Sequence, residues 1–304
     1  MEALKRIRID DSGKPRNTPG VNDRIGSLEN TSLEEIADAF NDAFSGYQVP
    51  VTMDADALSR LIRARSVRLD HSLGVFDGGR LTAFVLCGAR YLNGVLTAYN
   101  AGTGVRARAQ GNGLGTELMQ TWMGGLRSHG YRRCLLEVLA DNTPAIRLYE
   151  RSGFSVLHEL RCLRRSVGEY GSSGDSVTEG PVGTFLPARF THLRTFTPSW
   201  QNAAESINAV SATCRLVECL PEAGRAARPQ AFCVLNTDSG SLMQLGWTTV
   251  EHLMRVLARA ARLAEPSRLT VINVPAPDAE ALRVLAACGF ETFVSQVEMQ
   301  ADLE

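Results

Sequence analysis

The sequence predicts an α/β fold with a mixed sheet, built as two tandem units. Antiparallel strands are indicated early in the chain, where Asp77-Gly78-Gly79 and Asn93-Gly94 separate strand-like runs. A buried run, Cys134–Leu139, then lies between two helical patterns, which is typical of a strand covered on both faces. A similar succession returns in the second half, where Gly289-Phe290 repeats Gly153-Phe154 at an offset of 136 residues.

Length and composition allow two domains and exclude several classes of partner. The 304 residues are 44% hydrophobic, which is enough for two cores. A formal net charge of −1 gives no reason to expect nucleic acid as a partner. The seven cysteines form no C-x-x-C pair and no zinc-spaced cluster, so we expect free thiols in a reducing cytosol and no metal. No apolar run reaches about 18 residues and the N-terminus is polar, so we expect a cytoplasmic protein without a membrane partner.

The first half is expected to begin with a loose extension over residues 1–23, which are charged and rich in turn formers. A short strand is predicted at Arg24–Leu28. Ser32 with Glu35 forms a capping box that begins a helix, and a second helix is expected to start near Asp54. Three strands and a helix should follow, with the expected bounds Gly74–Phe76, Arg80–Ala89, Leu96–Val105 and, for the helix, Leu114–Leu126.

Basic residues gather on and just after the second predicted helix. A patch for nucleic acid is one interpretation of them, but the balanced charge of the chain favours an ordinary solvated helix face. The residues are Arg60, Arg63, Arg65 and Arg68.

The segment Val105–Gly115 joins an extended run to a helix and predicts an anion site. The first N–H groups of a helix have no intrahelical partner, and the helix dipole is positive there. Glycines at 111, 113 and 115 remove side chains that would block a phosphate, and Arg108 adds a positive charge. We therefore expect a bound diphosphate. No Gly-Lys-Ser/Thr follows, which excludes a P-loop, and the antiparallel strands before it argue against a dinucleotide fold.

This segment and a second one together resemble a known family. Residues Arg108–Gly113 resemble motif A of the GCN5-related N-acetyltransferases (GNAT), which bind the pyrophosphate of acetyl-CoA. Residues from Leu135 to Phe154 resemble motif B, and the resemblance covers about Arg24–Arg165. It implies a GNAT fold with acetyl-CoA as co-substrate. The cofactor contacts that it implies are Gly104, Val105, Arg108, Gln110, Gly111, Asn112, Gly113, Leu114, Gly115, Asn142, Ala145 and Tyr149.

Acetyl transfer to an amine requires a neutral amine, a stabilised carbonyl oxygen and a protonated leaving thiolate. By resemblance, Tyr149 is the candidate general acid; its alternative interpretation is a packing tyrosine on an amphipathic helix. Glu137 is the candidate general base, because its strand is predicted to be buried and burial raises the pKa of a carboxyl group. Its alternative is a structural hydrogen bond. The strand before the loop offers no carboxylate, so a water relay or Tyr99 stays an alternative base.

Three further expectations follow from the resemblance. A strand bulge at Gly104 and Val105 should expose amides to the acetyl carbonyl. Asn142 should bond the pantetheine arm, or alternatively begin a helix that Thr143 caps. Ala109 departs from the family pattern, in which a basic residue is common at this position. We therefore expect a weaker affinity for phosphate.

The second half is predicted to be a degenerate GNAT-like domain. We expect a linker at 166–183 between domains at 24–165 and 184–304. The loop before the helix Thr248–Ala264, which a Thr248…Glu251 capping box begins, has no R-x-x-G-x-G. Asp278 and Leu285 stand where the first half has Asn142 and Tyr149, and an aspartate disfavours an anion. A chance similarity between the halves is the alternative.

The sequence therefore predicts an acetyl-CoA-dependent N-acetyltransferase acting on a primary amine by direct attack. Alternatives are a non-catalytic acyl-CoA-binding or interaction module, and a transferase that uses another acyl-CoA. The acceptor could be a protein N-terminus, an amino acid, a polyamine or an aminoglycoside, and residues 44–50 are expected to line its pocket. The chain is expected to be a monomer or a homodimer.

Overall fold

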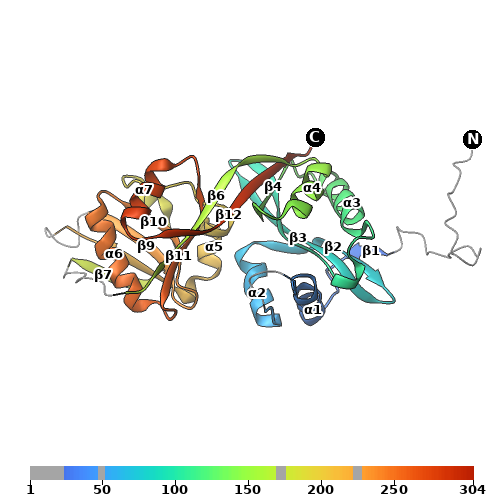
Figure 1. The fold of residues 1–304 in the computed structure, drawn as a ribbon, viewed down its shortest axis with the longest axis horizontal. Helices are drawn as coiled ribbons and strands as arrows, with labels where there is room; N and C mark the ends of the chain where they lie inside the picture. Colours follow the sequence, from blue (N-terminus) through green and yellow to red (C-terminus); the bar gives the residue numbers. More distant parts are fainter. Residues whose placement is uncertain (1–23, 47–51, 169–175, 222–227) are drawn as a thin grey trace, which may run out of the picture.

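The computed structural model describes residues 24–46, 52–168, 176–221 and 228–304, so the predicted N-terminal extension lies outside the described residues. Two lobes share one 12-stranded sheet (Figure 1). The strands are β1 (Ile25–Ser27), β2 (Val67–Asp77), β3 (Arg80–Leu92), β4 (Val95–Val105), β5 (Arg133–Leu139), β6 (Ser155–Ser166), β7 (Val177–Pro181), β8 (Cys214–Cys219), β9 (Ala231–Asn236), β10 (Ser241–Trp247), β11 (Arg268–Pro275) and β12 (Glu291–Asp302).

Helices cover both faces of each lobe's part of the sheet (Figure 1). The α-helices are α1 (Leu33–Ala43), α2 (Ala55–Ala64), α3 (Leu114–Ser128), α4 (Thr143–Arg151), α5 (Ala204–Ala209), α6 (Val250–Leu263) and α7 (Ala279–Ala287). Short 3₁₀ helices are η2 (Ala107–Ala109), η3 (Pro187–Phe190), η4 (Trp200–Asn202) and η5 (Ser211–Thr213). None of the helices in the described ranges is long and apolar enough to cross a membrane.

The antiparallel start of the sheet is confirmed. Gly78 and Gly79 have φ angles of 56° and 81°, and Asn93 and Gly94 have φ angles of 51° and 79°. Two successive residues with positive φ form the tight turn whose twist suits a hairpin, and glycine and asparagine adopt this conformation at low cost. The two hairpins therefore place β2, β3 and β4 side by side, and β4 leads directly into the predicted anion site.

Helix caps agree only in part with the predictions. Ser32 Oγ accepts from the Glu35 N–H as expected, but the Glu35 carboxylate accepts from the Leu81 N–H of β3 instead of completing a capping box. Asp54 caps α2 as predicted. Two predicted caps are wrong by one residue because a neighbouring side chain has the better geometry: Asn142 rather than Thr143 caps α4, and Thr249 rather than Thr248 caps α6.

Two packed layers hold the first lobe together on either side of its strands. Ile36, Phe40 and Leu58, on α1 and α2, form one buried cluster with the near face of the sheet. Trp122 and Leu118 of α3 are buried against the other face, together with part of α4. The site described below lies where strands between these layers separate.

The two halves exchange a strand with each other. The order through the middle of the sheet is β4-β5-β12-β6-β11-β10, so β12 of the second half lies between β5 and β6 of the first. In return β6 pairs with β11 of the second half. Figure 1 shows β6 and β12 crossing from one lobe to the other. Separating the halves would break both ladders, so neither lobe completes its sheet alone.

The predicted repeat is visible in the element bounds. α3, α4 and β6 begin at Leu114, Thr143 and Ser155, and α6, α7 and β12 begin 136 residues later in each case. The structure differs from the predicted linker at Val177–Pro181, which forms β7 and pairs with β8. The exact limits of the two domains stay a prediction, because the exchanged strands belong to both lobes.

Candidate functional site

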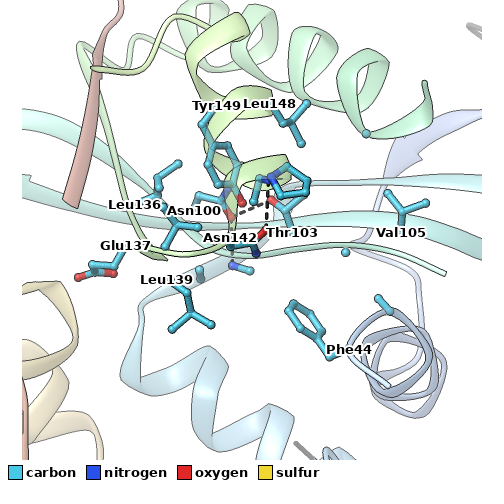
Figure 2. A pocket seen from close by; sticks show the side chains of 18 of the residues that line it. Phe44, Asn100, Thr103, Val105, Leu136, Glu137, Leu139, Asn142, Leu148 and Tyr149 are labelled. Atoms are coloured by element: carbon cyan, nitrogen blue, oxygen red, sulfur yellow. Dashed lines mark hydrogen bonds between the residues drawn. The ribbon is translucent and has the colours of Figure 1, made fainter. Parts of the chain in front are cut away.

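A cavity opens where β4 and β5 diverge. The two strands pair in parallel only over residues 97–99 and 133–135, and beyond that point their backbones separate. The cavity has a volume of about 980 Å³ and reaches both faces of the sheet. The predicted site residues that line it are Gly104, Val105, Gln110, Gly111, Gly113, Leu114, Gly115, Glu137, Asn142, Ala145 and Tyr149 (Figure 2). Arg108 and Asn112 do not line it, and both are exposed.

The loop before α3 presents unpaired N–H groups to this cavity. Among the described residues, no acceptor bonds the backbone N–H groups of residues 111–116. Gly111 and Gly113 have φ angles of 79° and 80°, a conformation that other residues rarely adopt. A Cβ atom on either would meet nothing within 4 Å, so the space before the helix is open. Together with the α3 dipole, this makes an anion site.

The start of this loop is anchored to α1 by a buried arginine that the sequence analysis missed. The Arg106 side chain is only 6% exposed, donates to the Leu81 carbonyl and pairs with Asp38 at 2.7 Å. Its guanidinium hydrogen bond lowers the pKa of Asp38. Asp42 accepts from the Ala107 N–H at 2.8 Å. The only sequence signal was the spacing of Asp38 and Asp42, which places both on one face of α1.

The predicted bulge at Gly104 and Val105 is wrong. These residues pair in regular register with Phe84 and Ala83, and the bulge lies at Ala101 instead. Gly104 is required for another reason, because a Cβ there would lie 2.7 Å from the Phe84 ring and 2.8 Å from the Ala43 Cβ. Close packing of α1 on β4 therefore accounts for that glycine.

Tyr149 and Asn100 face the cavity on the α3–α4 side of the sheet. Figure 2 shows the Tyr149 ring extending from α4 toward Asn100. Asn100 Oδ1 accepts from the Gly102 N–H at 3.1 Å and from Thr103 Oγ1 at 2.9 Å. Its Nδ2 is buried and has no hydrogen-bond partner among the described residues. Sequence analysis missed Asn100, and a buried asparagine in a strand was the signal available.

Glu137 faces the other side of the sheet, toward α1 and α2. Its Oε2 accepts from the Tyr99 hydroxyl and, at 3.4 Å, from Gln201 Nε2. Its Oε1 is buried without a hydrogen-bond partner among the described residues. Burial raises the pKa of Glu137 to about 7, although the hydrogen bond from Tyr99 acts in the opposite direction. A carboxyl group with this pKa can exchange a proton near neutral pH.

Two predictions change on this side of the cavity. Arg65 is not simply part of a solvated helix face, because it donates to the Ala101 carbonyl and to Gln201 Oε1 and lines the cavity. Asn142 Oδ1 accepts from the Ala145 N–H at 3.2 Å, so the alternative role as a helix-start residue is confirmed. Its contact with a cofactor stays a prediction. Phe44 lines the cavity as expected, and residues 47–50 lie outside the described residues.

The equivalent place in the second lobe lacks the long loop before its helix and the buried glutamate. β10 ends at Trp247 and α6 begins at Val250, so the connection is far shorter than the one from Val105 to Leu114. Asn273, completely buried, stands at the position of Glu137 in the repeat. Such a short connection cannot form the cradle of free N–H groups described above.

Comparison with known proteins relates the first half of the chain to one family. A family model described as the acetyltransferase (GNAT) family matches residues 33–154, which include the loop, β5 and all of α4. Residues 33–154 are thus similar to this family. A mycothiol acetyltransferase of Corynebacterium glutamicum (strain ATCC 13032) is 28% identical over 169 residues, covering 51% of this chain and 53% of that protein. A mycothiol acetyltransferase of Geodermatophilus obscurus is 50% identical over 52 residues, covering 17% of each chain. The matched regions thus span about half of these relatives or less.

Solved structures show that the GNAT fold extends over both halves. A tandem GNAT protein from the clavulanic acid biosynthesis pathway has a TM-score of 0.67 at 15% identity, covering 92% of this chain and 98% of that chain. A GCN5-related N-acetyltransferase from Sphaerobacter thermophilus has a TM-score of 0.64 at 16% identity, covering 92% and 95%. At this level of identity the likeness is one of fold. The chain therefore has the fold of a tandem GNAT protein.

Proposed function

We propose that the chain is an acetyl-CoA-dependent N-acetyltransferase whose first GNAT domain is active. One observation carries the proposal: two unsatisfied polar atoms from neighbouring strands line the same cavity. Asn100 Nδ2 is an unused donor, and Glu137 Oε1 is an unused acceptor. An unsatisfied buried polar group costs about 1–3 kcal/mol, so a ligand that satisfies both is favoured. A carbonyl oxygen suits the donor, and an amine N–H suits the acceptor.

The residues present fit acetyl-CoA. The N–H groups of residues 111–116 would hold its diphosphate, and Arg151, which lines the cavity, adds a positive charge nearby. The gap between β4 and β5 would hold the acyl arm, because the β4 and β5 backbones no longer pair there. Acetyl-CoA supplies the activated thioester of the reaction.

The chain's own residues divide the proton transfers between the two faces of the sheet. On one face Glu137, directly or through the Tyr99 hydroxyl, accepts the proton that the amine loses as its nitrogen bonds the acetyl carbon. On the other face Tyr149 is the donor to the sulfur as the carbon–sulfur bond breaks. Asn100 is placed to donate to the carbonyl oxygen, where negative charge develops.

The acceptor is proposed to be an amine on a small molecule or a peptide. The curated relatives are named mycothiol acetyltransferases, so a mycothiol-related amine is the first acceptor to assay. A non-catalytic acyl-CoA-binding module would need the N–H cradle but has no use for a carboxyl group with a pKa near neutrality. Cytoplasmic location, preference for acetyl over other acyl groups, and a monomeric or homodimeric state stay predictions.

Calorimetry with acetyl-CoA tests the binding part of the proposal. We expect one binding event per chain, because within the described ranges only the first lobe has a long loop of unpaired N–H groups before its helix. Release of free thiol in the presence of an amine panel then tests turnover. Absence of binding would contradict the proposal. Two equal sites per chain would contradict the expected loss of the acetyl-CoA site in the second lobe.

The anion cradle makes a sharper prediction at Gly113. Gly113→Ala should weaken acetyl-CoA binding about 10-fold, because the added methyl group occupies the space in front of the N–H groups. Gly130→Ala is the matched control: Gly130 has a φ angle of 79°, equally open surroundings, and no place in the cavity. Both variants should lose similar stability from the strained φ angle. Equal loss of acetyl-CoA affinity in the two would show that strain, not the cradle, is measured.

A further inference from the structure

A segment of the chain itself crosses the second lobe where its strands diverge, at the place that corresponds to the cavity of the first lobe. β10 and β11 pair in parallel only at Ser241 with Thr270, so these strands diverge as β4 and β5 do. Segment 194–202 bridges the opening. At one end the Arg194 backbone N–H donates to the Trp247 carbonyl at 2.9 Å, and its carbonyl accepts from the Trp247 N–H at 3.0 Å. At the other end Asn202 Nδ2 donates to the Ile272 carbonyl at 3.0 Å.

Several side chains of the second lobe hold this segment in place, and two of them, Asp278 and Asn273, stand at the repeat positions of Asn142 and Glu137. Arg194 pairs with Asp278 and, at 3.4 Å, with Glu280 at the start of α7. Asn273, at the repeat position of Glu137, donates to Ser199 Oγ at 3.2 Å. Gln244 Nε2 donates to the Asn202 carbonyl at 2.8 Å. Polar side chains of the degenerate lobe therefore bind this segment of the chain, and a smaller cavity of about 440 Å³ lies beside it.

The same segment continues into the active first lobe. The Trp200 ring stacks on the Tyr99 ring, with centroids 4.9 Å apart and planes inclined by 8°. Its Nε1 donates to the Arg65 carbonyl at 2.9 Å. The guanidinium of Arg90 lies 4.3 Å from the Trp200 ring centroid and donates to the Trp200 carbonyl. Trp200 is thus held from both sides by first-lobe residues and in turn fixes the Tyr99 ring.

Gln201 is the point where the segment reaches the candidate base. Its Oε1 accepts from Arg65 at 2.9 Å, and its Nε2 lies 3.4 Å from Glu137 Oε2. We propose that the second lobe serves the first through segment 194–202, with Trp200 and Gln201 as positioning residues that orient Tyr99 and Glu137 toward the acceptor amine. This inference rests on the proposed transferase function. It assigns the degenerate lobe a role in the acceptor site, with none in binding acetyl-CoA.

Among the described residues, the charged or titratable groups that face Glu137 come from several elements. Tyr99 faces it from β4 and Arg65 from the end of α2. Glu298 is its direct neighbour across the β5–β12 ladder, and His158 of β6 lies 3.4 Å from Glu298. Gln201 donates to the carboxylate form, which lowers the pKa of Glu137 against the larger effect of burial. Removing Gln201 should therefore raise the pKa of Glu137.

The test is Gln201→Leu in the full chain, with Gln300→Leu as control. Gln300 also comes from the second half of the chain, bonds Asp302 at 3.0 Å and does not line the cavity. For Gln201→Leu we expect kcat/KM for the acceptor to fall about 10-fold. We also expect the ascending limb of its pH profile, which follows ionisation of Glu137, to move upward by about half a pH unit. Acetyl-CoA affinity should stay within about twofold of the wild type, because the cradle lies on the first lobe alone. Arg194→Leu, which frees the other end of the segment, should change the same parameters in the same direction.

A second readout separates this inference from the proposed function. The titration of Glu137, followed by its ¹³C-labelled carboxyl resonance, should move upward in Gln201→Leu and stay unchanged in Gln300→Leu, whether or not an acceptor is known. Identical titrations and identical pH profiles in the two variants would overturn the inference while leaving the transferase proposal intact. If the wild type turns over no amine of the panel, the transferase proposal itself is contradicted.

Discussion

Glu137→Gln should lower kcat about 10²- to 10⁴-fold, the usual contribution of a positioned general base. Burial raises the pKa of Glu137 to about 7 from its ordinary value of 4.5. The basic, ionised form therefore accumulates as pH rises through about 7, and kcat/KM of the wild type should rise with it. The variant cannot ionise, so this limb should vanish from a profile measured between pH 5.5 and 9.

Glu218→Gln provides the matched control for removing a buried carboxylate. Glu218 is only 9% exposed and burial raises its pKa, but it pairs with Arg189 in the second lobe and is absent from the cavity. We expect the Glu218→Gln variant to keep both the ascending limb of the pH profile and the kcat of the wild type. If Glu137→Gln also keeps the ascending limb of the pH profile, that limb reports the ionisation of the acceptor amine. Glu137 would then have the structural role of its alternative interpretation.

The same ionisation should appear in the stability of the fold. Because the folded-state pKa of Glu137 is raised, its favourable contribution is complete below pH 4.5 and is lost as pH rises through about 7. The ionised carboxylate should then cost about 3 kcal/mol, from about 1.4 kcal/mol for each pKa unit. Glu137→Gln removes this cost, so its melting temperature should fall less than that of the wild type between pH 5 and pH 8.

Tyr149→Phe should lower kcat about 10²-fold with little change in acetyl-CoA affinity. The ring keeps its packing against Phe154, with centroids 5.9 Å apart, and only the hydroxyl is lost. If the hydroxyl protonates the leaving sulfur, its loss acts on the transition state and not on binding. Single-turnover thiol release with saturating acetyl-CoA measures the rate of this step, and calorimetry measures affinity.

Tyr131→Phe is the control for Tyr149→Phe. Tyr131 is equally buried, and its hydroxyl lies 2.7 Å from His71 Nδ1, outside the cavity. It should lose stability and keep the rate. An unchanged rate in Tyr149→Phe would assign Tyr149 to packing and leave the leaving thiolate to be protonated by water.

Local chemistry made much of the first lobe predictable. Positive φ angles at Gly78, Gly79 and Gly94 follow from residue type, so both hairpins could be placed from the sequence. Glu137 stood out because a carboxylate is rare in a buried strand. The bulge was misplaced because Gly104 is a glycine for packing against Phe84 and Ala43, and a sequence does not show which neighbours come close.

By itself, the sequence determined the family resemblance, the internal repeat and the loss of the second anion loop, because each rests on residues close together in the chain. Only the tertiary structure decided that β6 and β12 change places between lobes, and that Trp200 and Gln201 reach Tyr99 and Glu137. Such contacts join residues that are 64 or more positions apart in the sequence. No local pattern specifies them, since they depend on which strand edges meet when both lobes have folded.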